Sequence, residues 1–220
     1  MDQSRLHIGC GPSVFPGWVN IDKSPSVLLA RLPALRKLLF RLHLLTAEQA
    51  RGFPKGVVFA DVSKRIPAES ASVEFLYCSH MIEHLSRWQA LAFVSECHRV
   101  LRPGGWLRFA TPDLGLMIRD YLDGTSPFVD DGSTASDAFC AEYGAYADAP
   151  GNQGRRMLRK LAGGDNHQWL YDGEGLESLL HEGGFEIVER RQFREGSLPE
   201  LEQIEERERG LFVEARKAPA

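Results

Sequence analysis

The stretch that most constrains this chain is residues 6–22, where two short apolar segments flank a glycine turn. Residues 6–8 lead into the turn at residues 9–11, and residues 18–21 end on the carboxylate of Asp22. The pattern predicts a strand, a glycine turn, a second strand and an acid. Glycines at the carboxyl end of a strand let the backbone approach a ligand closely, and an aspartate there can accept both hydroxyls of a ribose. The first hypothesis is a nucleotide-like ligand above the carboxyl ends of parallel strands.

The glycine turn alone does not decide between a binding site and an ordinary turn. Gly9-Cys10-Gly11 lacks the third glycine of the dinucleotide fingerprint, because that position is Val14. A G-x-G segment is also common in tight turns. The two interpretations are separated by the residues that end the later strands.

Length and charge exclude several classes of protein. A chain of 220 residues can form one domain with a large core and an inserted cap. Its 43% hydrophobic and 25% charged residues are typical of a globular protein. A net charge of −4 and a pI near 6.0 do not indicate a broad nucleic-acid-binding face.

Cysteine usage and apolar runs bear on the compartment. The four cysteines lie far apart and form no C-x-x-C pair, which argues for reduced thiols and against a structural zinc site. The first residues do not resemble a signal peptide, and no apolar run reaches the length of about 18 residues needed for a membrane span. We expect a cytoplasmic protein.

Strands and helices alternate after residue 50. Residues 85–101 have helical apolar spacing, and the Arg-Pro-Gly-Gly segment 102–105 should end this helix. Four of its apolar residues recur every three positions and are predicted to face the sheet: Trp88, Leu91, Val94 and Cys97. A second helix is expected from the N-cap Asp172 to about Glu182. The remaining apolar runs are expected to be strands: 57–60, 73–78, 106–110, 185–190 and 211–215.

The first two strands are joined without a helix. Parallel neighbours usually need a crossover of a dozen or more residues, but here only residues 12–17 separate the two runs. About six extended residues span roughly 20 Å, barely enough to return along a five-residue strand. We nevertheless expect the pair to be parallel.

Two segments are expected to be insertions in a single domain spanning residues 1–220. In residues 24–47, leucines at helical spacing accompany Arg36, Lys37 and Arg41. This segment is either a helix packed on the sheet with a solvated basic face, or an amphipathic helix. The amphipathic helix would contact a membrane or a partner through residues 26–45, or gate substrate entry.

Residues 114–167 are expected to form a lid or acceptor-recognition insertion over the ligand face. The lid carries aromatic residues that could be its own core or the walls of an acceptor site: Phe139, Tyr143 and Tyr146. It also carries a basic cluster that is either a solvated face or a site for an anionic acceptor: Arg155, Arg156, Arg159 and Lys160.

Polar groups follow four successive predicted strands. They are the glycine turn, Asp22, Asp61 and the pair Ser79-His80. Ligands of open α/β sheets bind outside the carboxyl ends of the strands. An adenosine group requires a diol acceptor and an acceptor for the adenine amino group, which Asp22 and Asp61 would supply. Each aspartate alone is equally typical of a turn or a helix cap.

Nearly the whole chain, apart from the two insertions, resembles the class I S-adenosylmethionine-dependent methyltransferases. The motifs that carry the resemblance are LHIGCG with NID, FADV, LYCSHMIEHL, HRVLRPGGWLRFATPD, LYDGEGLESLLHEGGFEIVE and LFVEARK. The helix followed by LRPGG and a strand is the most specific of these. The short link from GCG to PGW is similar to a short-loop subgroup of the family.

The resemblance implies a Rossmann-like, α/β fold with a seven-stranded, mostly parallel sheet, an antiparallel last strand and helices on both faces. It implies S-adenosylmethionine as the cofactor. Gly9 and Gly11, with Cys10 between them, would flank the methionine portion. Asp22 would hold the ribose hydroxyls, and Asp61, followed by Val62, would hold the adenine amino group. Ser79 would lie beside the sulfonium end. One departure is His7, because many family members carry an acid at this position.

Catalytic candidates follow the fourth predicted strand. Methyl transfer mainly requires alignment of the acceptor with the donor, and a hydroxyl acceptor also requires a base. His80, Glu83 and His84 lie beside the expected methyl position, with His80 as the first candidate for the base. Asp113 and His167 are further candidates from neighbouring loops.

The spacing His80-x-x-Glu83-His84 leaves three interpretations open. It matches the H-x-x-E-H motif of a metallopeptidase class, but that class carries the motif on a helix. It also resembles methyltransferases in which an acid-x-x-Glu-His turn holds a divalent metal, although His80 replaces the acid. Glu83 and His84 thus have a structural or helix-start role, contact the substrate, or bind a metal.

Together these features predict a cytoplasmic methyltransferase that uses S-adenosylmethionine and a small-molecule or glycan-like acceptor, without nucleic acid as a partner. Two alternatives stay open. One is a module of the same fold that binds the cofactor but lacks catalysis. The other is a nicotinamide-dependent oxidoreductase, against which the missing third glycine and Asp61 speak.

Overall fold

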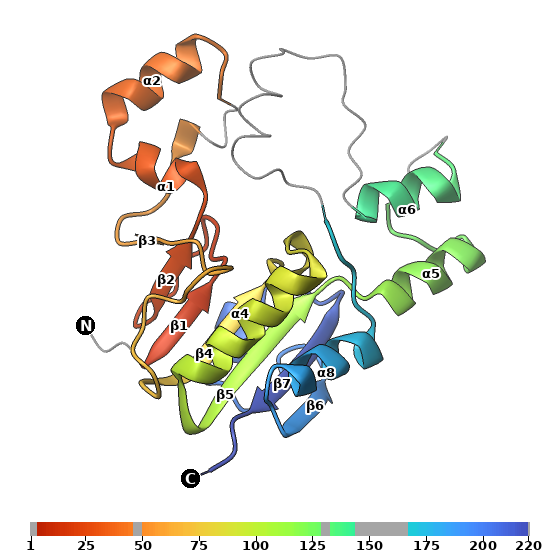
Figure 1. Cartoon of the computed structure of the whole chain (residues 1–220). Coiled ribbons are helices and arrows are strands. Elements are labelled where there is room, and N and C mark those ends of the chain that lie inside the picture. Colours follow the sequence, from red (N-terminus) through yellow and green to blue (C-terminus); the bar gives the residue numbers. More distant parts are fainter. Residues whose placement is uncertain (1–3, 46–49, 129–132, 144–166, 220) are drawn as a thin grey trace.

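One seven-stranded sheet forms the centre of the molecule (Figure 1), with strand order β3-β2-β1-β4-β5-β7-β6. The computed structural model describes residues 4–45, 50–128, 133–143 and 167–219. The strands are β1 (Arg5–Ile8), β2 (Val19–Asp22), β3 (Val58–Phe59), β4 (Val73–Ser79), β5 (Leu101–Thr111), β6 (Ile187–Arg191) and β7 (Leu211–Arg216).

The strand directions confirm the predicted fold class. Strands β1 to β5 pair with one another in parallel, and β7 is antiparallel to both β5 and β6. A parallel sheet with its last strand inserted in the opposite direction is the predicted Rossmann-like arrangement. It brings the carboxyl ends of β1 to β5 to one edge.

Strands β1 and β2 are parallel although no helix joins them, as expected. Leu6 pairs with Val19 and Ile8 pairs with Ile21. The connection is a series of turns, in which the Ser13 amide donates to the Cys10 carbonyl at 3.0 Å. This short path suffices because each strand has only four residues, so the chain must return roughly 13 Å.

Helices α4 (Arg87–Val100) and α8 (Gly173–Glu182) pack together over β5 and β7 (Figure 1). The Asp172 carboxylate accepts the Gly175 amide at 2.8 Å, which confirms the predicted cap of α8. The other side of the sheet carries a smaller apolar cluster around α9 (Leu201–Ile204).

The predicted buried face of α4 is wrong at one position. Val94 and Cys97 are fully buried, whereas Trp88 is 79% exposed. Nine residues separate Trp88 from Cys97, which is two and a half turns of 3.6 residues, so the two side chains lie on opposite faces. The residues that α4 buries are Ala90, Phe93, Val94, Cys97 and Val100.

The segment after α4 differs from its expected form. The helix ends at Val100, and β5 begins at once with Leu101 instead of Trp106. The pairing of β4 with β5 shifts between Val73 and Phe75, so that residues 102–105 form an irregularity within the strand. The proline and glycines therefore end the helix and also bend the strand that follows.

The basic insertion contains two helices, α1 (Pro25–Ala30) and α2 (Pro33–Arg41), connected to each other and, through α1, to β3. Figure 1 shows this helix pair standing beyond the tip of the sheet. No residue of α2 is buried. The expectation of a helix packed on the sheet is therefore wrong for α2, which contacts α1, while α1 contacts β3.

The insertion after β5 contains α5 (Leu114–Asp123) and α6 (Ala135–Tyr143), which pack against each other. Arg209 forms ion pairs with Asp120 of α5 and Glu142 of α6. The predicted basic cluster and Tyr146 lie outside the described residues. Among the described helices, none has the length and apolar composition that crossing a bilayer requires.

Candidate active site

The strand register aligns the predicted site residues along one edge of the sheet. Ile8 of β1 is opposite Ile21 of β2 and Cys78 of β4, and Ser79 is opposite Ala110 of β5. The glycine turn, Asp22, Asp61 and His80 therefore follow strand ends that lie side by side. This is the edge at which open α/β sheets bind ligands.

The two glycines of the turn both have positive φ angles, but they differ in what an added side chain would contact. A Cβ on Gly9, whose φ is +68°, would lie 2.7 Å from the Cβ of Met81. A Cβ on Gly11, whose φ is +52°, would meet no atom within 4 Å among the described residues. Gly9 is thus required by packing, whereas the backbone at Gly11 faces open space that a ligand can use.

The side chains of Cys10 and Val62 point into apolar clusters. Cys10 packs with Val27 and Val57, and burial raises the pKa of its thiol to about 12. Val62 belongs to the main core. A contact of either residue with a cofactor must therefore come from its backbone.

Asp22 links the glycine turn to the end of β2. Its Oδ2 accepts the Gly11 amide at 2.9 Å, and its Oδ1 accepts the Ser24 amide at 2.6 Å. Each carboxylate oxygen keeps a further lone pair for a ligand hydroxyl. Asp22 thus shapes the turn and still has acceptor capacity toward the open side of Gly11.

Asp61 ends the β3 segment and stays ionised. Its Oδ1 accepts the Ser63 hydroxyl at 2.6 Å. Partial burial raises its pKa, but the Ser63 hydroxyl and the charges of Lys23 and Lys64 outweigh this and lower the pKa overall. Both aspartates also accept the amide of the second residue after them, which confirms the turn-forming interpretation, while their ligand role stays a prediction.

His7 is a neutral core residue. It is 2% exposed, lies 3.1 Å from the Asn20 side-chain oxygen, and stacks on Phe15 with ring centroids 4.1 Å apart. Burial lowers its pKa to about 4. A neutral, enclosed imidazole cannot replace a carboxylate as the partner of an ammonium group.

His80 lies directly after β4, in a left-handed conformation with φ of +48°. Its amide donates to the Ala110 carbonyl at 2.8 Å, which fixes the residue between the ends of β4 and β5. Its Nδ1 is 3.3 Å from Oε1 of Glu83. A strained backbone of this kind is typical of functional positions.

Glu83 is a fully buried carboxylate behind His80. Its Oε2 accepts the Thr111 hydroxyl at 3.2 Å. Burial raises the pKa of Glu83, but the neighbouring His80 and His84 outweigh burial and hold it below its usual range. The helix-start role belongs to Ser86, which forms a capping box with Gln89.

The segment that follows the lid returns to the same turn. The amides of Gln168 and Trp169 both donate to the Glu83 carbonyl, at 2.7 and 3.2 Å. This places the His167 ring 4.9 Å from the His84 ring, measured between centroids, and its Nε2 4.0 Å from Glu83 Oε1. His167 thus joins the site, as the sequence suggested.

Asp113 has a structural role instead. Its Oδ1 accepts the amides of Gly115 and Leu116 and caps α5. Sequence reasoning missed Thr111 and Met81. Thr111 could have been found as the last residue of β5, adjacent to the end of β4, whereas the contact of Met81 with Gly9 depends on the turn after β4.

Comparison with known proteins fits this geometry. Residues 6–109 match the family model described as a methyltransferase domain. These residues include the glycine turn, Asp22, Asp61 and the turn that holds His80 and Glu83. The match covers just under half of the chain. The family predicted from the sequence, with S-adenosylmethionine as its cofactor, is confirmed, while the short-loop subgroup stays a prediction.

Curated relatives align with parts of this chain. It is 48% identical over 48 residues to a probable S-adenosylmethionine-dependent methyltransferase of Mycolicibacterium smegmatis, covering 22% of this chain and 18% of the relative. It is 29% identical over 126 residues to an uncharacterized 37.1 kDa protein in transposon TN4556 of Streptomyces fradiae, covering 55% of this chain and 33% of that protein. The chain thus spans a third or less of either relative's length.

The fold also matches solved structures. A structure of a SAM-dependent methyltransferase from Methanosarcina mazei superimposes with a TM-score of 0.50 at 15% identity, over 100% of this chain and 95% of that chain. At this identity the likeness concerns the fold alone. It agrees with the strand order of the sheet in this chain.

Proposed function

We propose that this chain transfers the methyl group of S-adenosylmethionine to a hydroxyl of a small-molecule or glycan-like acceptor by direct displacement. The observation that carries the proposal is the shared edge of the sheet. The open backbone at Gly11, the Asp22 carboxylate and the His80–Glu83 pair all follow adjacent strand ends.

The glycine turn and the two aspartates suit the cofactor. In this proposal Gly9, Cys10 and Gly11 hold the methionine portion, the last through its open backbone. Asp22 accepts the ribose hydroxyls, and the ionised Asp61 accepts the adenine amino group. The remaining contacts are Val62, through its backbone, and Ser79.

When bound, S-adenosylmethionine would supply a methyl group on a sulfonium: the acceptor oxygen would bond to the methyl carbon as the carbon–sulfur bond breaks, and S-adenosylhomocysteine would leave. The protein then has to align the acceptor and remove its proton. The His80 imidazole takes this proton. Glu83, 3.3 Å from His80 Nδ1, orients the ring and stabilises its protonated form, and His84 contacts the acceptor in this proposal.

The acceptor class rests on the aromatic rings beside the lid. Trp169 is 47% exposed, and its backbone is tied to Glu83. Tyr143 meets His167 edge-on with ring centroids 6.3 Å apart. An exposed tryptophan and a half-buried tyrosine next to a proposed catalytic turn offer a stacking surface to a sugar or an aromatic acceptor. The four free thiols, three of them buried, support a reducing cytoplasm as the place of the reaction.

Calorimetric titration with S-adenosylhomocysteine tests the cofactor site. The conservative variant Asp22→Asn keeps an oxygen for the Gly11 amide but loses the charge that binds a diol. We expect it to weaken binding about 10- to 100-fold, because hydrogen bonds to a charged group contribute about 1.5–3 kcal/mol. The control Asp123→Asn, at the exposed end of α5, should bind as the wild type does. A wild type that shows no heat with S-adenosylhomocysteine but binds NAD would support the oxidoreductase instead.

A labelled-methyl screen of cell extract tests the transfer itself. Once an acceptor is found, we expect His80→Gln to lower kcat about 10²- to 10⁴-fold, the usual contribution of general base catalysis. Its affinity for S-adenosylhomocysteine should stay unchanged. Cofactor binding with no turnover on any acceptor would instead favour the catalytically inactive module.

A further inference from the structure

Three potential metal ligands from two distant segments meet beside His80. Glu83 and His84 come from the turn after β4, and His167 comes from the segment that follows the lid. One ligand atom from each residue can be chosen so that all lie within 4.8 Å of one another. We name this group the Glu83–His84–His167 cluster.

Two atoms of the cluster are buried without a hydrogen bond among the described residues. They are Oε1 of Glu83 and Nδ1 of His167. His80 Nδ1 approaches Oε1 to 3.3 Å but not in hydrogen-bonding geometry. Buried polar atoms are rarely left unpaired, because an unmade hydrogen bond costs free energy. Beside its contact with His80 Nδ1, the carboxylate oxygen can therefore accept a further, positively charged partner.

We propose that the Glu83–His84–His167 cluster binds a divalent transition-metal ion. Two imidazoles and one carboxylate suit first-row ions such as Zn²⁺, Mn²⁺ or Fe²⁺ better than Mg²⁺ or Ca²⁺, which prefer oxygen ligands. Ligands about 2.1 Å from a tetrahedral ion lie roughly 3.4 Å apart, so an inward movement of about 1 Å closes the site.

Three protein ligands leave at least one coordination position open. Because the cluster adjoins His80, that position would lie close to the proposed catalytic base. The ion would hold the acceptor oxygen there and lower the pKa of its hydroxyl. This role rests on the proposed function, whereas metal binding itself does not.

Titration of tag-free protein with Co²⁺, followed by visible absorption, tests the site in the absence of cofactor and acceptor. We expect one ion per chain, displaced by Zn²⁺ but not by Mg²⁺. His167→Ala should weaken Co²⁺ binding about 100-fold or more, because even partners of metal ligands commonly contribute 10- to 100-fold. The background variant Cys140→Ser removes the exposed thiol as a competing ligand.

His43→Asn serves as the control, because His43 lies near α2 in a left-handed conformation that asparagine tolerates. It should bind Co²⁺ as the wild type does. Glu83→Gln should also lose binding, and thermal unfolding without metal shows whether that variant is folded. A wild type without stoichiometric Co²⁺ binding, or equal binding by His167→Ala, would overturn the proposal. Because neither result depends on S-adenosylhomocysteine binding, it leaves the cofactor assignment unaffected.

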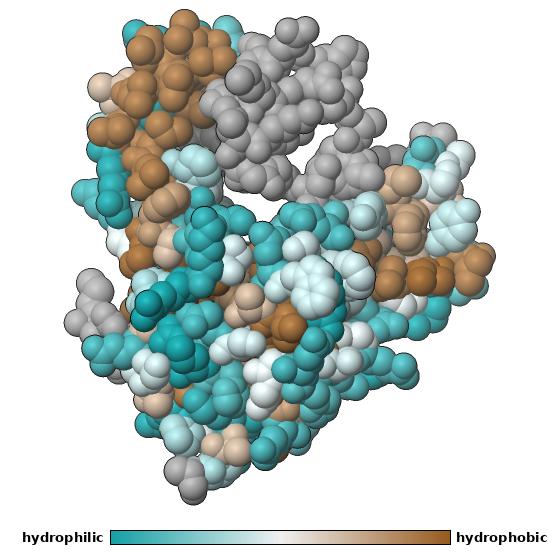
Figure 2. Space-filling view, viewed as in Figure 1, coloured by the Kyte–Doolittle hydropathy of each residue, from teal (hydrophilic) through white to brown (hydrophobic). Residues whose placement is uncertain are grey.

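A second inference rests on a different surface. Helices α1 and α2 and their flanks expose six large apolar side chains, at 41–56% each, which form a brown patch in Figure 2. We name this patch the α1–α2 apolar face, and its residues are Leu28, Leu32, Leu35, Leu38, Phe40 and Leu42. Monomeric proteins rarely expose so many neighbouring apolar side chains without a partner.

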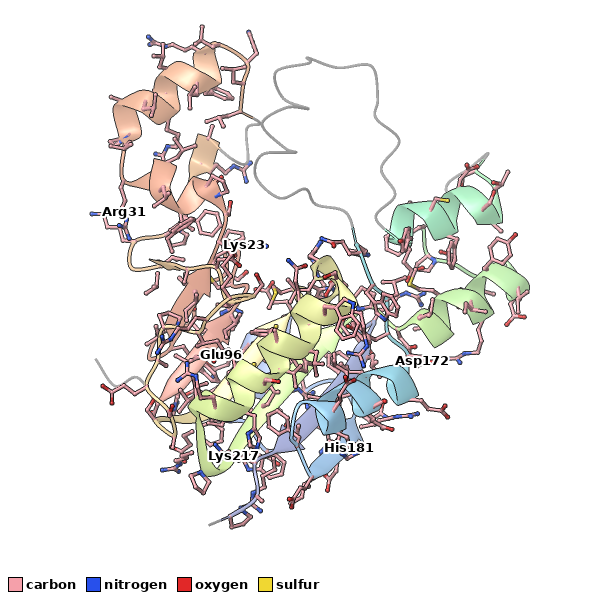
Figure 3. The ribbon with its side chains drawn as sticks, viewed as in Figure 1. Lys23, Arg31, Glu96, Asp172, His181 and Lys217 are labelled. Carbon is pink, nitrogen blue, oxygen red and sulfur yellow. The ribbon has the colours of Figure 1, made fainter. Side chains whose placement is uncertain are left out.

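The charge around this face identifies the kind of partner. Residues 23–58 carry seven lysines and arginines and one acid, a net charge of +6, although the whole chain carries −4. Arg31 projects from the helix pair, away from the sheet (Figure 3). A pocket of about 660 Å³ beside it, between α1 and β3, is lined by apolar groups including Phe53 and Val57.

We infer that the α1–α2 apolar face docks on an anionic lipid surface. Leucine and phenylalanine side chains would enter the acyl region, while the surrounding cations pair with lipid headgroups. The strongly negative remainder of the chain would stay directed toward water. This combination favours a membrane surface over a second copy of the chain, because two such basic faces would repel each other.

Co-sedimentation with vesicles tests this inference. We expect binding to phosphatidylcholine vesicles that contain phosphatidylglycerol, and at least tenfold weaker binding to pure phosphatidylcholine. Leu35→Ser with Leu38→Ser should abolish binding, whereas the control Ile118→Ser with Leu122→Ser, on exposed apolar residues of α5, should not. Failure to bind anionic vesicles, with dimers seen by analytical ultracentrifugation, would overturn the inference in favour of self-association.

Discussion

Replacing Gly9 and Gly11 separately by alanine distinguishes a packing requirement from a ligand requirement. Both residues have positive φ angles, of +68° and +52°. An L-residue in the left-handed region costs roughly 1–2 kcal/mol. Each variant should therefore lose this much free energy of unfolding before any contact is considered.

The contacts of a new methyl group then separate the two variants. At Gly9 the added Cβ would lie 2.7 Å from the Cβ of Met81. Relieving such an overlap typically costs a further 1–3 kcal/mol, so Gly9→Ala should destabilise the fold by about 2–5 kcal/mol. At Gly11 the Cβ meets no described atom within 4 Å, so Gly11→Ala should lose only about 1–2 kcal/mol.

The effect on ligand binding should run in the opposite order. Gly11 lies beside Asp22, whose Oδ2 accepts its amide at 2.9 Å. A methyl group there enters the open space that the cofactor is proposed to use. We expect Gly11→Ala to weaken S-adenosylhomocysteine binding at least tenfold, which is about 1.4 kcal/mol, although most of its stability remains.

Urea unfolding followed by circular dichroism gives the stabilities, and calorimetry gives the affinities of the folded variants. Equal destabilisation by the two substitutions would show that the Met81 contact does not matter. Wild-type affinity in Gly11→Ala would show that the open side of Gly11 is not where the cofactor binds. Either outcome would refute the reasoning.

Three further predictions concern stability. Arg108→Leu removes the cation beside the buried Glu205 carboxylate and leaves the buried Glu214 with Arg191 alone. It should cost about 3–5 kcal/mol in urea unfolding; a smaller loss would mean that water reaches the two carboxylates. His7 has a folded-state pKa of about 4, below the unfolded value of 6.5. Its contribution to the free energy of unfolding, about 3 kcal/mol, is therefore present above pH 6.5 and is lost as the pH falls toward 4. His7→Gln should remove this part of the pH dependence, and an identical dependence of stability on pH in the variant and the wild type would contradict the assignment. Asp172→Ala removes the cap of α8 and should cost about 1 kcal/mol of unfolding free energy. Thermal unfolding measures this loss, and an unchanged midpoint would contradict the capping role.

Much of the candidate site follows from local sequence signals. The glycine turn, the aspartates that end β2 and β3, and the turn from Ser79 to His84 are each encoded within a few residues. A strand's carboxyl end is a fixed place in a parallel sheet, so the order of the motifs along the chain was sufficient to predict that they share one edge.

The errors arise where a face or a partner had to be chosen. The prediction for Trp88 assumed an interval of three residues, which drifts around a helix of 3.6 residues per turn. The prediction for α2 assumed that its leucines cover the sheet, but β3 has only two residues and both are exposed. His7 was recognised as a departure from the family pattern, yet its enclosed position against Phe15 became clear only in the fold.

The sequence by itself determined the order and type of the elements, the glycine turn and the caps, because hydrogen bonds and dihedral angles within a few residues decide them. The tertiary structure alone decided which distant side chains meet. His167 reaches Glu83 across 84 residues, and Arg108 reaches Glu205 across 97 residues. Such contacts depend on how the whole sheet brings its loops together, and no local pattern records them.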